Sequence, residues 1–231
     1  MARADLGKDP EQVSSMFDDV ARKYDRVNDL LSLGQTRRWR KRVVRIIDPK
    51  PGMSILDIAA GPGSSSEPLQ QAGADVVALD FSEGMLAQGR KVRPKLTFVK
   101  GDALQLPFPD HHFDLTTISF GIRNTNDYEK ALREAYRVTK PGGRMVIVEF
   151  STPTNKLFRN IYLNYLMRLL PRVARLTSSN PDAYVYLAES IRAWPDQSTF
   201  AAKMSANGWL TPTWVNLTGG VVAVHTGNKP L

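Results

Sequence analysis

The sequence predicts an α/β domain with a doubly wound, mostly parallel sheet of seven strands, and three observations support this. Between residues 53 and 150, short apolar runs with β character alternate with helical patterns, the order of elements typical of a parallel sheet. The turn after the first of these strands is rich in glycine, which lets the backbone approach a neighbouring group closely. The length of 231 residues fits one domain.

The chain begins with two helical patterns. Apolar residues recur at spacings of three and four between residues 11 and 31, which predicts one face of a helix: Val13, Met16, Phe17, Val20, Tyr24, Val27 and Leu31. The second pattern, residues 35–47, is strongly basic and contains Arg37, Arg38, Arg40, Lys41, Arg42 and Arg45. Two prolines and a glycine within residues 48–52 end it.

The alternating region follows. Its strands are expected at 53–59, 75–80, 96–100, 113–119 and 143–150, with helices at 64–72, 83–92 and 127–139. Residues 154–193 read as helical. Two last β runs, 212–217 and 220–226, predict an antiparallel pair joined across Gly219-Gly220 or by a longer connection.

Composition excludes several classes of protein. The chain has no cysteine, so a disulfide scaffold, a site with Cys-bound zinc or iron–sulfur, and a thiol nucleophile are ruled out. No apolar run is long enough to span a membrane, and residues 1–10 lack the apolar segment of a secretory signal. The formal charge of +8 leaves three kinds of partner open: nucleic acid, an anionic membrane surface or an acidic small molecule.

Four consecutive predicted strands end in residues suited to a nucleoside ligand. After the first strand, Asp57 leads into a turn with Ala59, Gly61, Pro62 and Gly63. The second ends at Asp80-Phe81, the third is followed by Asp102-Ala103, and the fourth ends at Ser119. An acidic residue at the end of the second strand suits a ribose diol, and ligands of open α/β sheets bind at these carboxyl ends.

Two cofactor classes remain at this point, a dinucleotide and S-adenosylmethionine. The dinucleotide pattern places a third glycine where this chain has Ser66. The Asp57–Gly63 form, together with the later Gly101-Asp102-Ala103, therefore favours S-adenosylmethionine.

The motifs resemble the class I S-adenosylmethionine-dependent methyltransferases, and more narrowly the C-methyltransferase family of ubiquinone and menaquinone biosynthesis. The similarity covers nearly the whole chain. Its narrower motifs are the Tyr24/Asn28 cluster, the run from Ser119 to Asn124 (SFGIRN), and the run from Asn216 to Gly220 (NLTGG). A Lys140-Pro141-Gly142-Gly143 turn and Glu149-Phe150-Ser151 accompany them.

The resemblance implies C-methylation of a demethylated prenylquinol, demethylmenaquinol to menaquinol, with S-adenosylmethionine as cofactor, S-adenosylhomocysteine as product and no metal. The cofactor-binding residues would be Asp57, Ala59, Gly61, Pro62, Gly63, Asp80, Phe81, Asp102, Ala103 and Ser119. Arg123, Asn124 and Tyr24 would be catalytic, and the same three together with Asn28 would bind the substrate. The N-terminal helix would close over the site as a lid.

Arg123 is the candidate for stabilising the phenolate that makes the ring carbon nucleophilic. The alternative is a loop arginine paired with a neighbour such as Asp127. Tyr24 or His225 could instead serve as the base, although a core position is equally compatible with His225. Two other functions stay open: a non-catalytic cofactor-binding regulator and a methyltransferase acting on another small molecule or on nucleic acid.

Two departures and one helix complete the predictions. The family usually has Thr where this chain has Pro62, and often an acidic residue where this chain has Ser64. Because Pro62 has no N–H and no hydroxyl, a compensating donor such as Ser64 or Ser65 is expected for the methionine end of the cofactor. Residues 156–170 predict a helix that is apolar around most of its circumference. It is buried against the sheet or in a homodimer, or it forms a wall for the prenyl tail with a basic rim on anionic lipid.

The predicted organisation is a single domain in the cytoplasm, with possible peripheral attachment to the inner face of the cell membrane and no nucleic-acid partner. Within it, residues 1–48 form the lid, 52–150 the cofactor-binding core, 151–195 a helical insertion and 196–231 the C-terminal strands.

Overall fold

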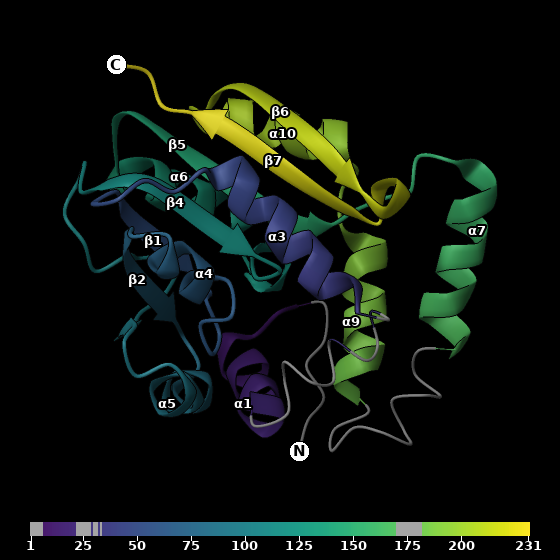
Figure 1. Ribbon diagram of the computed structural model, residues 1–231. Helices are drawn as coiled ribbons and strands as arrows, with labels where there is room; N and C mark the ends of the chain where they lie inside the picture. The colour runs from purple at the N-terminus through teal and green to yellow at the C-terminus, as the bar shows by residue number, and fades with distance from the viewer. Residues whose placement is uncertain (1–6, 22–28, 30–31, 33, 170–181) are drawn as a thin grey trace.

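A seven-stranded sheet forms the centre of the molecule, in the order β3-β2-β1-β4-β5-β7-β6 (Figure 1). The computed structural model describes residues 7–21, 29, 32, 34–169 and 182–231. The strands are β1 (Ser54–Ile58), β2 (Asp75–Asp80), β3 (Thr97–Lys100), β4 (Phe113–Ser119), β5 (Thr139–Phe150), β6 (Leu210–Leu217) and β7 (Val222–Asn228). β1 to β5 pair in parallel, and β7 lies antiparallel between β5 and β6. The predicted mostly parallel sheet is confirmed.

The helices cover both faces of this sheet. They are α1 (Pro10–Val20), α3 (Gln35–Ile47), α4 (Ser66–Gln71), α5 (Glu83–Val92), α6 (Tyr128–Val138), α7 (Lys156–Asn164), α9 (Asp182–Ala193) and α10 (Gln197–Ala206). Successive strand residues point to opposite faces, so Ile55 packs with α3 and α4, while Leu56 packs with α6 and α10. The two faces therefore have separate apolar cores.

The chain order reverses between β1 and β4, which are adjacent although β2 and β3 intervene in sequence. At such a switch point the connecting segments leave in opposite directions, and the carboxyl ends of the strands border a crevice. In Figure 1, α1 and the lower ends of α3 and α9 lie beside this edge.

Most predicted elements are confirmed within two residues, and two differ. β5 begins at Thr139 instead of 143, because Thr139 pairs with Phe113 and the Lys140–Gly143 segment forms an irregularity inside the strand. α10 was not predicted at all. Its N-terminus is capped by Asp196, whose side chain accepts from the Thr199 N–H at 2.8 Å.

The two predicted long helical segments are described in part. α1 and Ala21 cover the first part of 11–31, and 22–28 lie outside the described residues. In 154–193, α7 continues as a π-helix (Tyr165–Leu169), and α9 resumes after 170–181, which also lie outside. No helix within the described ranges is long and apolar enough to cross a membrane.

Candidate functional site

Two cavities open at the carboxyl edge of the sheet. The first, which we call the acidic cavity, is about 130 Å³ and is lined by Asp80 and Asp102. The second, the aromatic cavity, is about 170 Å³ and is lined by Trp39, Phe120 and Phe150. They share five lining residues, Phe17, Ala59, Gly61, Ser119 and Phe120. A ligand could therefore extend from one cavity into the other past this common wall.

The glycine turn after β1 is held by its own backbone and by Asp80. The Ala60 N–H donates to the Leu79 carbonyl at 3.0 Å and the Gly63 N–H to the Ala60 carbonyl at 3.0 Å. The Gly61 N–H donates to Asp80 Oδ2 at 2.7 Å. A Cβ added to Gly61 would meet nothing closer than Met85 Sδ at 4.0 Å, so there is open space beside this residue for ligand atoms.

Asp57 supports this turn from beneath. It is fully buried and lines neither cavity. Its Oδ2 accepts hydrogen bonds from the Ser65 hydroxyl at 2.7 Å and the Ser66 hydroxyl at 2.6 Å. Burial raises the pKa of Asp57 to about 6, although the two hydroxyls oppose the shift. Asp57 thus supports the turn without reaching either cavity, its contact with the cofactor stays a prediction, and the Ser65 proton is already committed to Asp57.

The acidic cavity contains most of the other predicted cofactor-binding residues: Ala59, Gly61, Asp80, Phe81, Asp102, Ala103 and Ser119. Pro62 lines the aromatic cavity, and Gly63 lines neither cavity. Asp80 accepts the Ser82 N–H at 2.9 Å in addition to Gly61, and burial raises the pKa of its carboxyl. Asp102 Oδ1 accepts the Leu104 N–H at 2.8 Å. Two oriented carboxylates beside an open glycine turn fit a nucleoside with a ribose diol.

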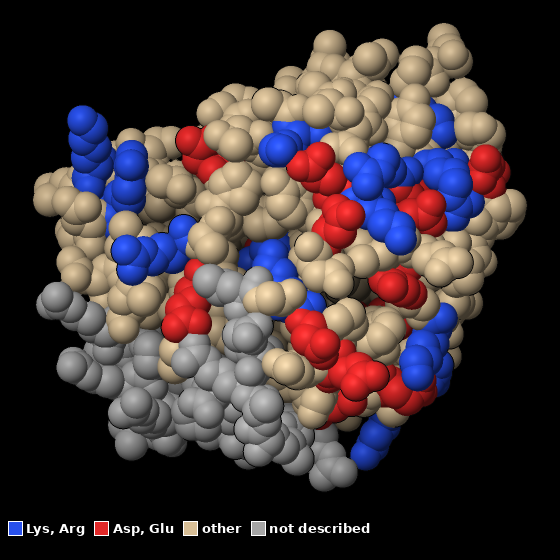
Figure 2. Space-filling model, turned by 180° about the vertical axis from the view of Figure 1, so that it is seen from behind, with Lys and Arg blue, Asp and Glu red and all other residues tan. Residues whose placement is uncertain are grey.

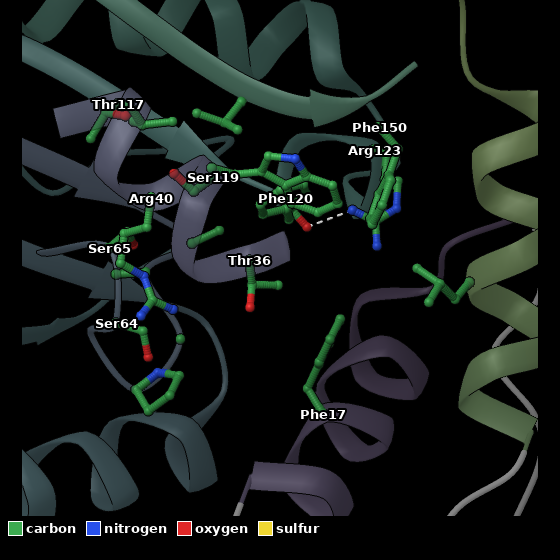
Figure 3. A pocket seen from close by; sticks show the side chains of 18 of the residues that line it. Phe17, Thr36, Arg40, Ser64, Ser65, Thr117, Ser119, Phe120, Arg123 and Phe150 are labelled. Atoms are coloured by element: carbon green, nitrogen blue, oxygen red, sulfur yellow. Dashed lines mark hydrogen bonds between the residues drawn. The ribbon is translucent and has the colours of Figure 1, made fainter. Parts of the chain in front are cut away.

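Arg123 is the charged centre of the aromatic cavity (Figure 3). It is only 5% exposed. Its Nη1 donates to Glu149 Oε1 at 2.8 Å and to the Phe120 carbonyl at 2.7 Å. The guanidinium carbon lies 5.1 Å from the centre of the Phe150 ring. Its Nε has no hydrogen-bond partner within the described part of the chain, which leaves one buried donor available for a ligand.

Glu149 is the partner that sequence reasoning missed. The expected neighbour of Arg123, Asp127, instead accepts the Lys130 N–H at the start of α6 and lies 3.9 Å from Arg133. Glu149 is buried at the end of β5, and burial raises its pKa while the Arg123 charge opposes the shift. The parallel pairing of β4 and β5 could have indicated this partner. Ser119 aligns with Val148, so the residues that follow these two positions lie at the same edge of the sheet.

Asn124 and Arg123 both donate to the Phe120 carbonyl, but they line different cavities. Asn124 lines the acidic cavity, whereas Arg123 lines the aromatic one. Its Oδ1 accepts a hydrogen bond from the Tyr186 hydroxyl at 3.2 Å. Tyr186 comes from α9 and lines the aromatic cavity, and the sequence predicted no role for it at the site. Tyr24 and Asn28, the other predicted substrate-binding residues, lie outside the described residues.

The remaining candidate base belongs to the core. His225 lies on β7, is buried, and has Nε2 2.9 Å from the Gln197 carbonyl oxygen. It lines neither cavity, and burial lowers its pKa. The core position that the sequence allowed for His225 is therefore confirmed, away from both cavities. Within the described ranges no three His, Cys, Asp or Glu residues come together as a metal site.

α1 is the described part of the N-terminal segment that was predicted to close over the site. Phe17 points from α1 into the aromatic cavity (Figure 3). Asp18 accepts the Gly84 N–H at 2.9 Å and also bonds the Ser82 hydroxyl, which ties α1 to α5. Lys8, just before α1, lines the acidic cavity, and its pKa is lowered by burial and by the charge of Arg123. The first turns of the chain thus close one side of both cavities.

Comparison with known proteins identifies what this arrangement is similar to. Residues 6–229 match the model of the ubiE/COQ5 methyltransferase family. The demethylmenaquinone methyltransferase of Paenarthrobacter aurescens is 60% identical over 100% of this chain and 91% of its own length. The proteins of the same name from Streptomyces avermitilis and Mycobacterium marinum are 59% and 57% identical, over 99% and 100% of this chain and 99% of each relative.

Solved structures share the fold. An S-adenosylmethionine-dependent methyltransferase from Thermotoga maritima has a TM-score of 0.70 at 21% identity, over 94% of this chain and 99% of that one. A phosphoethanolamine N-methyltransferase from Haemonchus contortus, in complex with S-adenosylmethionine, has a TM-score of 0.61 at 16% identity, over 84% of this chain and 53% of that one.

Proposed function

Because the chain belongs to the ubiE/COQ5 methyltransferase family, we propose that it methylates a ring carbon of demethylmenaquinol with S-adenosylmethionine, forming menaquinol. The observation that carries this proposal is full-length identity of 54–60% to proteins named demethylmenaquinone methyltransferase. The geometry agrees, since an acidic cavity suited to a nucleoside adjoins an aromatic cavity with a buried cation.

The acidic cavity would hold the adenosine part of the cofactor. Asp80 suits the ribose hydroxyls and Asp102 the adenine amino group, and Ser119 lies on the wall shared with the aromatic cavity. When bound, S-adenosylmethionine supplies a methyl group on a positively charged sulfur, which is a good leaving group. The chain itself must align the ring carbon with that methyl group and make the ring more nucleophilic.

Arg123 would supply the second requirement. A hydroquinone hydroxyl has a pKa near that of tyrosine, about 10, and a nearby cation favours its ionisation. Ionisation increases the electron density at the adjacent ring carbon. Glu149 fixes the guanidinium through Nη1, while Phe120, Phe150 and Trp39 give the ring an apolar, water-excluding surface. Arg123 is thus positioned to stabilise the quinolate oxygen.

The test is incubation of the purified chain with methyl-labelled S-adenosylmethionine and chemically reduced demethylmenaquinone, followed by mass spectrometry. We expect one labelled methyl group on the naphthoquinone ring. A parallel reaction with a demethylated benzoquinol reports the ring preference. Cofactor binding without methylation of any quinol would instead support a non-catalytic regulator.

We also propose that the chain acts on the cytoplasmic side, at an anionic membrane surface. α3 exposes Arg37, Arg38, Lys41, Arg42 and Arg45. Of these five, Arg37 alone has an ion pair within the described residues, with Asp29 at 2.7 Å. Unpaired basic residues on one helix are complementary to anionic lipid.

The opposite face has a different charge pattern. Figure 2 shows basic and acidic side chains next to one another on the side covered by α6 and α10. There Arg137 pairs with Glu134 and Lys203 with Glu129, each at 2.8 Å. The basic surface is therefore a property of the α3 side.

α7 adds exposed apolar groups. Leu157 is 71% and Ile161 59% exposed, whereas Phe158 and Tyr162 pack against the core under α3. α7 thus has one face on the protein and an apolar face open to its surroundings, which supports an interfacial helix more than a buried one.

Sedimentation with liposomes tests the membrane proposal. Binding to anionic vesicles should exceed binding to zwitterionic ones and should fall as salt rises. The triple variant Arg38→Glu/Lys41→Glu/Arg42→Glu should lose it. The matched control Lys91→Glu/Lys95→Glu/Lys130→Glu, which changes exposed residues elsewhere, should retain most binding. Equal loss in both variants would mean that only net charge matters.

A further inference from the structure

The turn between β1 and α4 has little capacity left to bind an anion. Residues 60, 61 and 63 donate their backbone N–H groups to Leu79, Asp80 and Ala60. Pro62 has neither an N–H nor a polar side chain. The hydroxyls of Ser65 and Ser66 donate to Asp57. Apart from Ser64 and the N–H groups at the start of α4, a negatively charged ligand group beside Pro62 would take its donor from another element.

Arg40 is placed to be that donor. It lies on α3, is half-buried, and lines the aromatic cavity together with Pro62, Ser64 and Ser65. In Figure 3 its side chain extends from α3 toward the turn that carries Ser64 and Ser65. Unlike Arg123, it has no ion pair or hydrogen-bond acceptor in the described part of the chain.

The position of Arg40 matches one group of the cofactor. If the ribose is held at Asp80 and the methyl group faces the shared wall at Ser119 and Phe120, the amino-acid end extends from the sulfur into the aromatic cavity beside the glycine turn. This end carries a carboxylate. A guanidinium forms strong, charge-assisted hydrogen bonds to a carboxylate, often through two N–H groups.

We propose that Arg40 binds the α-carboxylate of the methionine part of S-adenosylmethionine. This inference rests on the proposed function, because it assumes that S-adenosylmethionine is the cofactor. It also assigns the compensating donor for Pro62 to Arg40. The two cations of the aromatic cavity then have separate tasks: Arg40 holds the cofactor and Arg123 acts on the ring.

Two ligands that differ only in the amino-acid end test this assignment. S-Adenosylhomocysteine carries the carboxylate, whereas 5′-methylthioadenosine keeps the adenosine and the sulfur but lacks the amino-acid end. Binding of each to the full chain is measured by titration calorimetry. Arg40→Gln should weaken S-adenosylhomocysteine binding by about 10- to 100-fold, the value of a charge-assisted hydrogen bond, and leave 5′-methylthioadenosine within about twofold.

Control variants make the result specific. Arg42→Ala removes an exposed arginine from the same helix that lines neither cavity, and it should leave both affinities unchanged. Arg40→Lys should retain part of the affinity for S-adenosylhomocysteine. Unchanged binding of 5′-methylthioadenosine also shows that Arg40→Gln folds.

The outcomes separate this inference from the proposed function. An unchanged affinity of Arg40→Gln for S-adenosylhomocysteine, or an equal loss for both ligands, would overturn the role of Arg40. Failure of the unmodified chain to bind S-adenosylhomocysteine would overturn both proposals. Binding with the predicted selectivity, but without methylation of any quinol, would support Arg40 and reject the quinol as substrate.

Discussion

The acidic and aromatic cavities share one wall but are assembled in different ways. The acidic cavity takes its two carboxylates from the end of β2 and from the loop that follows β3. The aromatic cavity combines α3, the segment after β4, the end of β5 and α9, whose lining residues range from Thr36 on α3 to Leu187 on α9. The carboxylates of the acidic cavity thus follow from local sequence, whereas the aromatic cavity depends on how distant elements pack.

We therefore expect the acidic cavity to bind the cofactor and the aromatic cavity to activate the quinol ring. Carboxylates at strand ends are suited to the hydroxyls of a nucleoside. The buried Arg123–Glu149 pair is suited to a developing negative charge, because a preoriented cation in an apolar site needs no reorganisation. Changes in the acidic cavity should therefore affect cofactor affinity, and changes at Arg123 should affect turnover.

The largest effect is expected at Arg123. The double variant Arg123→Gln/Glu149→Gln removes both charges together, so that no buried charge is left unpaired. We expect kcat for quinol methylation to fall by about 10²- to 10³-fold, as when a transition-state donor is removed. The dissociation constant for S-adenosylhomocysteine should change by less than about threefold. Retention of most of the turnover would remove Arg123 from the chemistry.

The next effect concerns Asp57, which supports the glycine turn between the two cavities. The pKa of its carboxyl is about 6 in the folded chain and about 3.9 when unfolded. Between these values the folded state binds more protons, so this group makes the free energy of unfolding decline as pH rises, by about 3 kcal/mol in total.

Asp57→Asn removes that contribution. Urea unfolding from pH 4 to pH 7.5 should show that the stability of the variant, relative to the original chain, improves as pH rises. Asp110 and Glu134, whose pKa values are lowered by Arg137, have the opposite pH dependence but are common to both proteins. A constant difference across this range would contradict the raised pKa.

A smaller effect is expected at Asp80. Asp80→Asn keeps the shape of the side chain but loses the charge and one acceptor for the Gly61 and Ser82 N–H groups. The affinity for S-adenosylhomocysteine should fall by about 10- to 30-fold, with kcat at saturating cofactor much less affected. Asp75→Asn, at the exposed opposite end of β2, is the control. A fall in kcat without a loss of affinity would contradict the division between the cavities.

The smallest effect is expected at Pro62. Pro62→Thr adds one hydroxyl and one N–H at the turn that lines the aromatic cavity. Cofactor affinity should rise by about two- to tenfold, since a neutral hydrogen bond contributes about 1 kcal/mol. Calorimetry with S-adenosylmethionine measures it. Unchanged or weaker binding would show that the turn needs no further donor.

The sequence predicted correctly those features that depend on residues close together in the chain. β1 to β4, the glycine turn, and the placement of Asp80 and Asp102 follow from apolar runs and from what ends them. α10 was missed although Asp196 caps it and Phe200, Ala201 and Met204 are buried on one face. Its apolar face is short, and it was passed over between the long helical segment and the last strands.

The features of the site that the sequence did not predict are side-chain contacts that only the fold brings about. The alternative considered for Arg123 was a pair with Asp127, four residues away, but Glu149 on the adjacent strand binds it. The sequence grouped Arg123 with Asn124, yet the 3-10 turn Ile122–Asn124 directs the two side chains to different cavities. It offered Ser65 as a donor, but the buried Asp57 carboxylate takes that proton.

The sequence by itself determined the class of fold, the edge of the sheet that binds, and the carboxylates of the acidic cavity. Each follows from periodicity and from residues that end parallel strands, which the topology brings to one edge. Only the tertiary structure decided the composition of the aromatic cavity. Strand register and helix packing determine which distant groups are buried together. As a result Arg123 is held by Glu149, while Arg40 has no acceptor among the residues that the structure describes.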